Sequence, residues 1–222
     1  MARVLGTVTI GQSPRIDVIP ELRTILGVGV DVIEAGALDG LTLEEVKRLA
    51  PGPGDHVLVT RMADGAAVKI AGKHILPLMQ EKIDGLVGRG ADVVALLCTG
   101  EFPEFRCDKL LVVPQKVMLH VATAVVEGFR LGVMLPDADQ VPQGIRRWSA
   151  VTLDVFIEPA SPYGNPEAVD RAARRLRERG VGAIVMDCIG YTLAMKEKVR
   201  EITGAPVILA RSILARVLAE LA

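Results

Sequence analysis

The chain carries one sequence pattern twice, and this repeat constrains its fold more than any other feature. Residues 89–100 (RGADVVALLCTG) align without a gap on residues 179–190 (RGVGAIVMDCIG). In each copy a helix-like segment ends at Arg-Gly, a short apolar run follows, and the run stops at Cys-x-Gly. The repeat therefore predicts two similar half-molecules, with Cys98 and Cys188 in matching positions.

The similarity between the halves extends beyond the two cysteines. Each Cys-x-Gly is followed later by a strand-like run that leads into a helical segment, and residues 3–8 resemble residues 129–134. We therefore expect a duplicated protein. Its first lobe comprises residues 1–115 plus a C-terminal helix at 212–222, and its second lobe comprises residues 116–211.

Strand-like and helix-like segments alternate along the chain, and several of the strand-like runs are apolar throughout. Such runs are typical of parallel strands covered on both faces, and the alternation predicts an α/β fold with mostly parallel sheets and helices on both faces. The expected strands are residues 4–10, 30–35, 56–61, 93–97, 110–113, 131–135, 152–158, 182–186 and 206–209.

Local motifs refine this expectation. Thr42 and Glu45 have the spacing of a capping box at the start of a helix. Asp64-Gly65 predicts a β-hairpin between residues 57–62 and 66–70. Pro20 and Pro77 fall in helical patterns, where proline is tolerated only if the helix begins nearby.

Composition excludes several functional classes. The net charge of −1 argues against a nucleic-acid surface, which needs a basic stripe. No apolar stretch approaches the ~18 residues that span a bilayer, and the N-terminus lacks a signal-peptide pattern. The 3 cysteines are widely separated, as suits a reducing compartment. We therefore expect a cytoplasmic protein with no nucleic-acid or membrane partner.

Several of these segments together resemble the AroM family, within the wider group of cofactor-independent Asp/Glu/hydantoin racemases. The resemblance spans essentially the whole chain. It is carried by residues 9–14 (TIGQSP), the Cys98-Thr99-Gly100 turn, residues 186–190 (MDCIG), and the terminal segment 207–221 with its Ile213-Leu214-Ala215-Arg216.

This resemblance implies two Rossmann-like (flavodoxin-like) lobes related by a pseudo-two-fold, with the active site between them. It implies no cofactor, and it suggests a homodimer. The amino-acid racemases have Asn-Thr after the first cysteine where this chain has Thr99-Gly100. Cys-x-Gly at both positions is closer to the hydantoin racemase pattern, and Asp187 before Cys188 is a further departure.

The resemblance assigns Cys98 and Cys188 as catalytic acid and base on a carbon next to a carbonyl. The substrate is then a small carboxylate or a cyclic amide. Both cysteines follow strands, and ligands of open α/β sheets bind at the carboxyl ends of strands. The predicted substrate-binding residues lie in such strand-end loops: Gly11, Gln12, Ser13, Thr60, Arg61, Thr99, Gly100, Gly190, Tyr191 and Thr192.

Simpler interpretations remain open for these residues. A single cysteine is as easily a small buried hydrophobe, and Cys107 has no counterpart in the second half. Ser13-Pro14 is also a good helix start, Arg61 suits a surface ion pair, and Tyr191 suits packing. The three histidines lack metal-ligand spacing, so we expect no metal site.

Two other functions compete with the racemase. One is a single-cysteine decarboxylase or cis-trans isomerase on the same scaffold, and the other is a non-catalytic small-molecule-binding protein.

Overall fold

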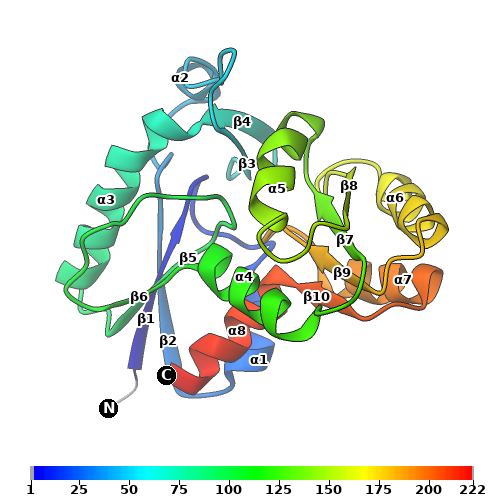
Figure 1. Ribbon diagram of the computed structural model, residues 1–222. Coiled ribbons are helices and arrows are strands. Elements are labelled where there is room, and N and C mark those ends of the chain that lie inside the picture. Colours follow the sequence, from blue (N-terminus) through cyan, green and yellow to red (C-terminus); the bar gives the residue numbers. More distant parts are fainter. Residues whose placement is uncertain (1–2, 222) are drawn as a thin grey trace. The chain divides into compact units, whose positions relative to one another are not determined.

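The computed structural model describes residues 3–221, and the chain divides into two compact units (Figure 1). Unit 1 runs up to Gln115 and resumes at Ala215, and unit 2 is Lys116–Leu214. Two helices therefore contain the boundaries between the units: α4 (Pro114–Val125) and α8 (Ala210–Leu221).

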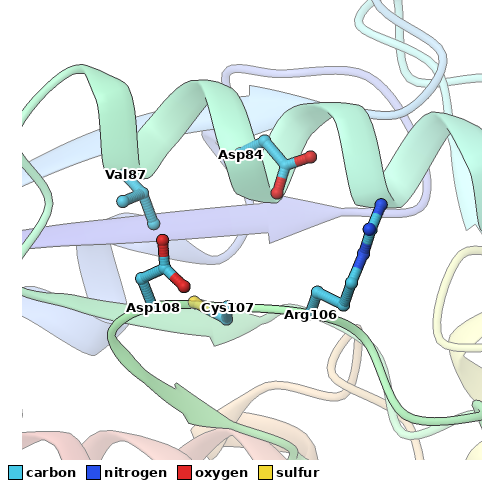
Figure 2. A pocket seen from close by; sticks show the side chains of 5 residues that line it. All are labelled: Asp84, Val87, Arg106, Cys107 and Asp108. Carbon is cyan, nitrogen blue, oxygen red and sulfur yellow. The ribbon is translucent and has the colours of Figure 1, made fainter.

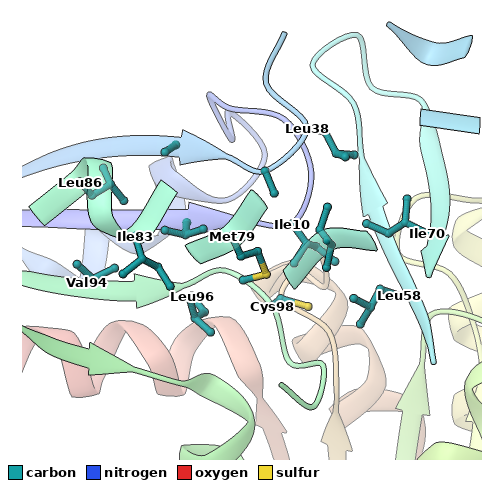
Figure 3. Close-up of a cluster of buried hydrophobic side chains, with 14 of the residues drawn as sticks. Ile10, Leu38, Leu58, Ile70, Met79, Ile83, Leu86, Val94, Leu96 and Cys98 are labelled. Atoms are coloured by element: carbon teal, nitrogen blue, oxygen red, sulfur yellow. The ribbon is translucent and has the colours of Figure 1, made fainter. Parts of the chain in front are cut away.

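Unit 1 is built on a parallel sheet in the order β2-β1-β5-β6. Its strands are β1 (Arg3–Thr9), β2 (Val30–Gly36), β5 (Val93–Leu96) and β6 (Leu110–Val112). Its helices are α1 (Ile19–Leu26), α2 (Leu43–Lys47) and α3 (Gly72–Gly88). Figure 3 shows how Met79, Ile83 and Leu86 of α3 face Val94 and Leu96 of β5, which forms the apolar core of this unit.

An antiparallel hairpin interrupts unit 1 between its second and third sheet strands. It consists of β3 (Val57–Arg61) and β4 (Ala67–Ala71), with Thr60 paired opposite Val68. Gly65 at its tip has φ +94°, a conformation that L side chains rarely adopt. The hairpin predicted from Asp64-Gly65 is therefore present.

Unit 2 contains a second parallel sheet, in the order β10-β9-β7-β8. Its strands are β7 (Leu131–Leu135), β8 (Val155–Pro159), β9 (Ala183–Met186) and β10 (Val207–Leu209). The helical elements that lie within it are η1 (Ala138–Gln140), α5 (Val141–Trp148), α6 (Pro166–Glu178) and α7 (Leu193–Thr203). Alternate residues of β7 pack into two different apolar clusters, Met134 with α6 and Val133 with α4, so helices cover both faces of this sheet.

The two sheets have the same topology. In each, the first strand along the chain lies between the second and the third, and the fourth lies beside the third: β2-β1-β5-β6 corresponds to β8-β7-β9-β10. Cys98 follows the third strand of one sheet and Cys188 the third strand of the other. The predicted α/β fold with parallel sheets and flanking helices is confirmed.

The structure agrees with the local sequence predictions at Thr42 and Pro20 and differs at Pro77. Thr42 forms both hydrogen bonds of a capping box with Glu45, and Pro20 lies in the first turn of α1. Pro77, however, lies inside α3, which begins at Gly72 directly after β4. Because Pro77 is on the exposed side of the helix, water can serve the carbonyl that its missing amide leaves unpaired. Over residues 3–221, no helix combines the length and hydrophobicity needed to cross a bilayer.

The close contact between the hairpin and the end of β1 gives a stability prediction. A Cβ at Gly11 would lie 2.3 Å from the backbone oxygen of Arg61 and 2.4 Å from Oγ1 of Thr60. We expect Gly11→Ala to lower the free energy of unfolding by about 1–3 kcal/mol through overpacking. The matched control is Gly85→Ala in α3, where no atom lies within 4 Å and helix propensity should add about 0.5–1 kcal/mol. Urea unfolding of both variants checks this, and equal midpoints would contradict it.

Candidate active site

The Cys98 turn closes the third strand of unit 1. Leu97 donates its backbone N–H to the carbonyl of Val8 at 2.7 Å, which ties the start of the turn to β1. Cys98 is 9% exposed, and its Sγ accepts a hydrogen bond from the backbone N–H of Gly100 at 3.3 Å. The sulfur therefore lies just beyond a strand end with a main-chain donor directed at it.

The Cys188 turn repeats this arrangement in unit 2. Asp187 donates its N–H to the carbonyl of Met134 at 3.0 Å, and Met134 belongs to the strand that corresponds to β1. Cys188 is 7% exposed, and its Sγ accepts from the N–H of Gly190 at 3.4 Å. The repeated Cys-x-Gly motif thus has a structural meaning, since the glycine amide donates to the cysteine sulfur in both units.

Close packing explains why glycine occupies the third position of each turn. A Cβ at Gly100 would lie 2.6 Å from a methyl carbon of Leu58, and one at Gly190 would lie 2.4 Å from the hydroxyl of Tyr163. A hydrogen bond from an amide to sulfur favours the thiolate over the thiol, and the thiolate is the reactive form of cysteine. Both turns therefore place a main-chain donor against their sulfur.

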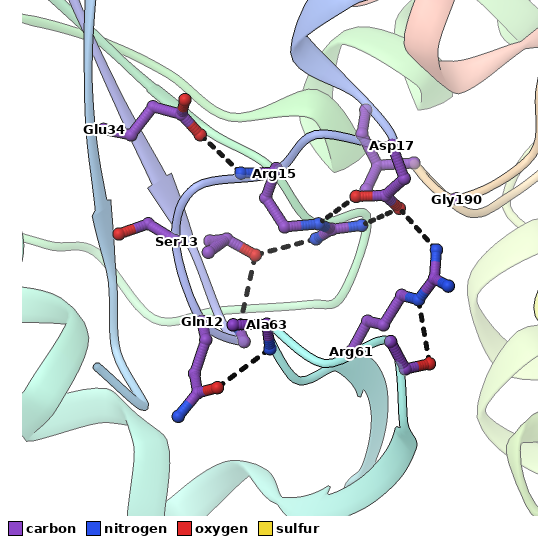
Figure 4. A network of polar contacts seen from close by, with 12 residues as sticks. Gln12, Ser13, Arg15, Asp17, Glu34, Arg61, Ala63 and Gly190 are labelled. Atoms are coloured by element: carbon purple, nitrogen blue, oxygen red, sulfur yellow. Dashed lines mark hydrogen bonds and ion pairs between the residues drawn. The ribbon is translucent and has the colours of Figure 1, made fainter. Parts of the chain in front are cut away.

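The loop after β1 contains Gln12 and Ser13, which the sequence predicts as substrate ligands. The Gln12 amide group donates to the carbonyls of Leu38 and Leu41 at 3.1 and 2.8 Å, and its oxygen accepts from the N–H of Ala63 at 2.8 Å. Ser13 donates its hydroxyl to Asp39 at 2.7 Å. These side chains join the β1 loop to the β2 loop and the hairpin (Figure 4), so in this structure they hold the strand-end loops together.

Two arginines share one carboxylate beside this loop (Figure 4). Arg15 is 2% exposed; its Nε and Nη2 each donate to Asp17 at 2.8 Å and its Nη1 donates to Thr9 at 2.8 Å. Arg61 lies 3.9 Å from Asp17 and donates its Nε to the carbonyl of Gly65 at 2.9 Å. The Arg61 side chain is 35% exposed, so it retains a solvent-facing edge.

Thr60 is a predicted substrate ligand whose hydroxyl is buried. It is 1% exposed, and its Oγ1 has no hydrogen-bond partner within the described part of the chain. The oxygen lies against Gly11, in the same group of loops as Gln12 and Arg61. Buried hydroxyls are normally paired, so an unpaired one at the strand ends suits a ligand that supplies the missing partner. Thr99 is also buried.

In unit 2, the side chains of the two predicted ligands after Gly190 serve the protein's own structure. Tyr191 is fully buried and its hydroxyl donates to the carbonyl of Ala160 at 2.5 Å. Thr192 caps α7 by accepting from the N–H of Met195 at 3.1 Å. Both contacts fix the chain that follows Cys188. In this structure Tyr191 lies in the interior of unit 2, which agrees with the interpretation that it packs there.

Sequence reasoning missed two buried arginines around Cys188. Arg211 is 1% exposed and donates to the carbonyls of Ile189 and Gly190 at 3.0 and 3.2 Å. Arg147 donates to the carboxylate of Asp187. The position of Arg211, two residues after the end of β10, was an available signal, because residues after strand ends are where such loops converge. Arg147 had no signal, since it lies 40 residues from its partner.

A separate pocket of about 390 Å³ lies elsewhere in unit 1 (Figure 2). It is lined by Asp84 and Val87 of α3 and by residues 106–108, which include Cys107. None of the predicted site residues lines it. Within residues 3–221 there is no group of three or more His, Cys, Asp or Glu side chains that could hold a metal ion.

The sequence model of one family, described as AroM protein, matches residues 5–222. No curated protein matches the chain.

Solved structures share its fold at low sequence identity. Picrophilus torridus aspartate racemase has a TM-score of 0.66 at 13% identity, covering 99% of this chain and 94% of the racemase. The maleate isomerase Iso from Pseudomonas putida S16 has a TM-score of 0.62 at 12% identity, with 99% and 92% coverage. Allantoin racemase from Klebsiella pneumoniae has a TM-score of 0.61 at 15% identity, with 99% and 87% coverage.

The environment of Tyr191 yields a pH prediction. Burial, and after it the negative charge at Cys188, Asp187 and Tyr163, raises the pKa of Tyr191 well above its usual value of 10.0. Above pH 10.0 the unfolded chain releases the proton of the Tyr191 hydroxyl, whereas the folded protein keeps it. The unfolded state then binds fewer protons, so the free energy of unfolding falls as the pH rises.

We expect urea midpoints of the wild-type protein to fall between about pH 9 and pH 11, and to fall less in Tyr191→Phe. At neutral pH the same variant should lose about 1 kcal/mol with the Ala160 hydrogen bond. The chain has 2 tyrosines, so Tyr163→Phe isolates Tyr191 in the tyrosinate absorbance. That signal should rise only with unfolding. A signal that rises in the folded state would contradict the assignment.

Proposed function

The chain belongs to the AroM protein family, and from this premise we propose that it is a cofactor-independent racemase or isomerase that uses Cys98 and Cys188 as its acid and base. The observation that carries the proposal is the repeated turn. Two cysteines follow the third strands of two sheets of equal topology, and each sulfur accepts a hydrogen bond from the glycine two residues later.

The proposed reaction moves one proton on and one proton off a single carbon. One cysteine, as the thiolate, takes the proton from a carbon next to a carboxylate or a cyclic amide carbonyl. The other cysteine, as the thiol, gives a proton to the opposite face of that carbon. The two sulfurs exchange protonation states, so the reverse turnover starts from the product with the roles reversed, and no cofactor is required.

The negative charge that develops on the substrate oxygens must be stabilised by donors already in place. The buried and unpaired hydroxyl of Thr60 is one such donor in unit 1, beside Gly11. The main-chain amides of the two turns favour the thiolate that begins each half-reaction. The solvent-facing edge of Arg61 suits the carboxylate of a substrate.

The solved structures support the substrate class. Aspartate and allantoin, named in two of them, each carry an exchangeable hydrogen on a carbon next to a carbonyl. Maleate, named in the third, is a small dicarboxylate. We therefore propose a small carboxylate or cyclic amide as the substrate. We also propose a cytoplasmic homodimer with no nucleic-acid or membrane partner.

The test is a screen of chiral acids, amino acids and hydantoins for loss of optical rotation, with uptake of deuterium from solvent read by mass spectrometry. For a substrate found in this way, Cys98→Ala and Cys188→Ala should each reduce racemisation by at least about 100-fold, the lower range for an acid/base group. Each variant should retain deuterium exchange for one enantiomer, because one thiolate still removes the proton it faces.

Cys107→Ala is the matched control and should behave as the wild-type protein, because Cys107 lies in neither turn. Racemisation that survives in both single variants would exclude the thiol pair. A trapped covalent adduct on one cysteine, with the other dispensable, would indicate the single-cysteine chemistry instead.

A further inference from the structure

The two cysteine turns differ at one position that matters electrostatically. Leu97 and Asp187 precede the two cysteines and make the same backbone hydrogen bond, to Val8 and to Met134. Both side chains are buried, but one is apolar and the other is a carboxylate. A carboxylate next to a thiol opposes formation of the thiolate, because like charges repel strongly where water is excluded. The residue before Cys188 therefore opposes its ionisation, whereas the residue before Cys98 carries no charge.

Arg147 offsets the negative charge of Asp187. Its Nη2 donates to Oδ2 of Asp187, and the Arg147 and Asp187 side chains are 6% and 1% exposed. Trp148 donates its Nε1 to the same carboxylate oxygen at 2.8 Å. Arg147 and Trp148 are the last two residues of α5, so the end of this helix is held to the residue that precedes Cys188.

Other charged and titratable groups around this turn within unit 2 include Arg211, Tyr163 and Tyr191. Arg211 donates to the carbonyls of Ile189 and Gly190, the two residues after Cys188. The Tyr163 hydroxyl lies against Gly190. Burial raises the pKa of Tyr191, which therefore stays neutral at physiological pH. Within this group Asp187 supplies a carboxylate, and Arg147 supplies a cation that contacts it.

We propose that Arg147 is a positioning residue that neutralises Asp187 and so allows Cys188 to ionise near neutral pH. This inference rests on the proposed function, in which Cys188 must act as a base. It also goes beyond that function, because it makes the two sulfurs differ in how they are controlled. The residue before Cys98 is the apolar Leu97, whereas the residue before Cys188 belongs to a buried ion pair.

The experiment measures the rate of iodoacetamide alkylation against pH on the full chain, with each cysteine followed by peptide mass spectrometry. Arg147→Met should raise the pH midpoint of Cys188 by at least about one unit, because the carboxylate of the preceding residue then lacks its guanidinium partner and acts on the thiolate through an effective dielectric near 20. Cys98, measured in the same sample, should not move. Arg147→Lys keeps the charge and should shift Cys188 by less than half as much as Arg147→Met.

Asp187→Asn supplies the opposite test. It removes the negative charge, preserves an oxygen for Trp148, and should lower the midpoint of Cys188. The double variant Arg147→Met/Asp187→Asn removes both charges and should return the midpoint most of the way to the wild-type value. A packing defect left by the shorter side chain at position 147 would not be repaired in this way.

An unchanged Cys188 midpoint in Arg147→Met overturns the inference, and so do equal shifts of both cysteines or a double variant that is not restored. If Arg147→Met fails to fold, the direction of the Asp187→Asn shift decides alone, and an upward or absent shift overturns it. Alkylation needs no substrate. The inference therefore fails or succeeds separately from the racemase proposal, which the chiral screen decides.

Discussion

The hydrogen bond from a glycine amide to a cysteine sulfur is the interaction on which the rest of this site depends. It occurs at 3.3 Å for Cys98 and at 3.4 Å for Cys188. Parallel strands end at one edge of their sheet, so a turn at that edge presents its side chain where ligands of α/β proteins bind. The third-position glycine lets Leu58 in one unit and Tyr163 in the other approach the turn closely. Duplication of this Cys-x-Gly turn supplies the two sulfurs that the proposed proton transfers need.

Most polar side chains near the turns stabilise the loops that carry them. Gln12 bridges three loops, Arg15 is paired with Asp17, and Tyr191 is bonded to Ala160. Each contact restricts the loop in which its residue lies. The exceptions are Thr60, with its unpaired hydroxyl, and Arg61, with its partly exposed side chain. In the proposed function these two side chains contact the substrate.

The sequence was a good guide where structure is local. Residues 89–100 and 179–190 align because each copy contains a complete strand and turn, and Asp64-Gly65 and Thr42 specify a hairpin and a helix start within a few residues. It was a poor guide to side-chain partners. Nothing near Gln12 indicates that it bonds to Leu41 and Ala63, and nothing near Arg147 indicates Asp187. These contacts depend on tertiary packing, which a one-dimensional pattern does not contain.

The central claim is that Cys98 and Cys188 act on the same substrate atom. A short cross-linker with two thiol-reactive groups tests this claim most directly. In the Cys107→Ala variant, such a reagent should join the Cys98 and Cys188 peptides of one chain, as seen by mass spectrometry after proteolysis. A ligand of the site should block the joining. Separate reagent molecules on each cysteine, with no joined peptide at any reagent span that a small substrate could fill, would contradict the account.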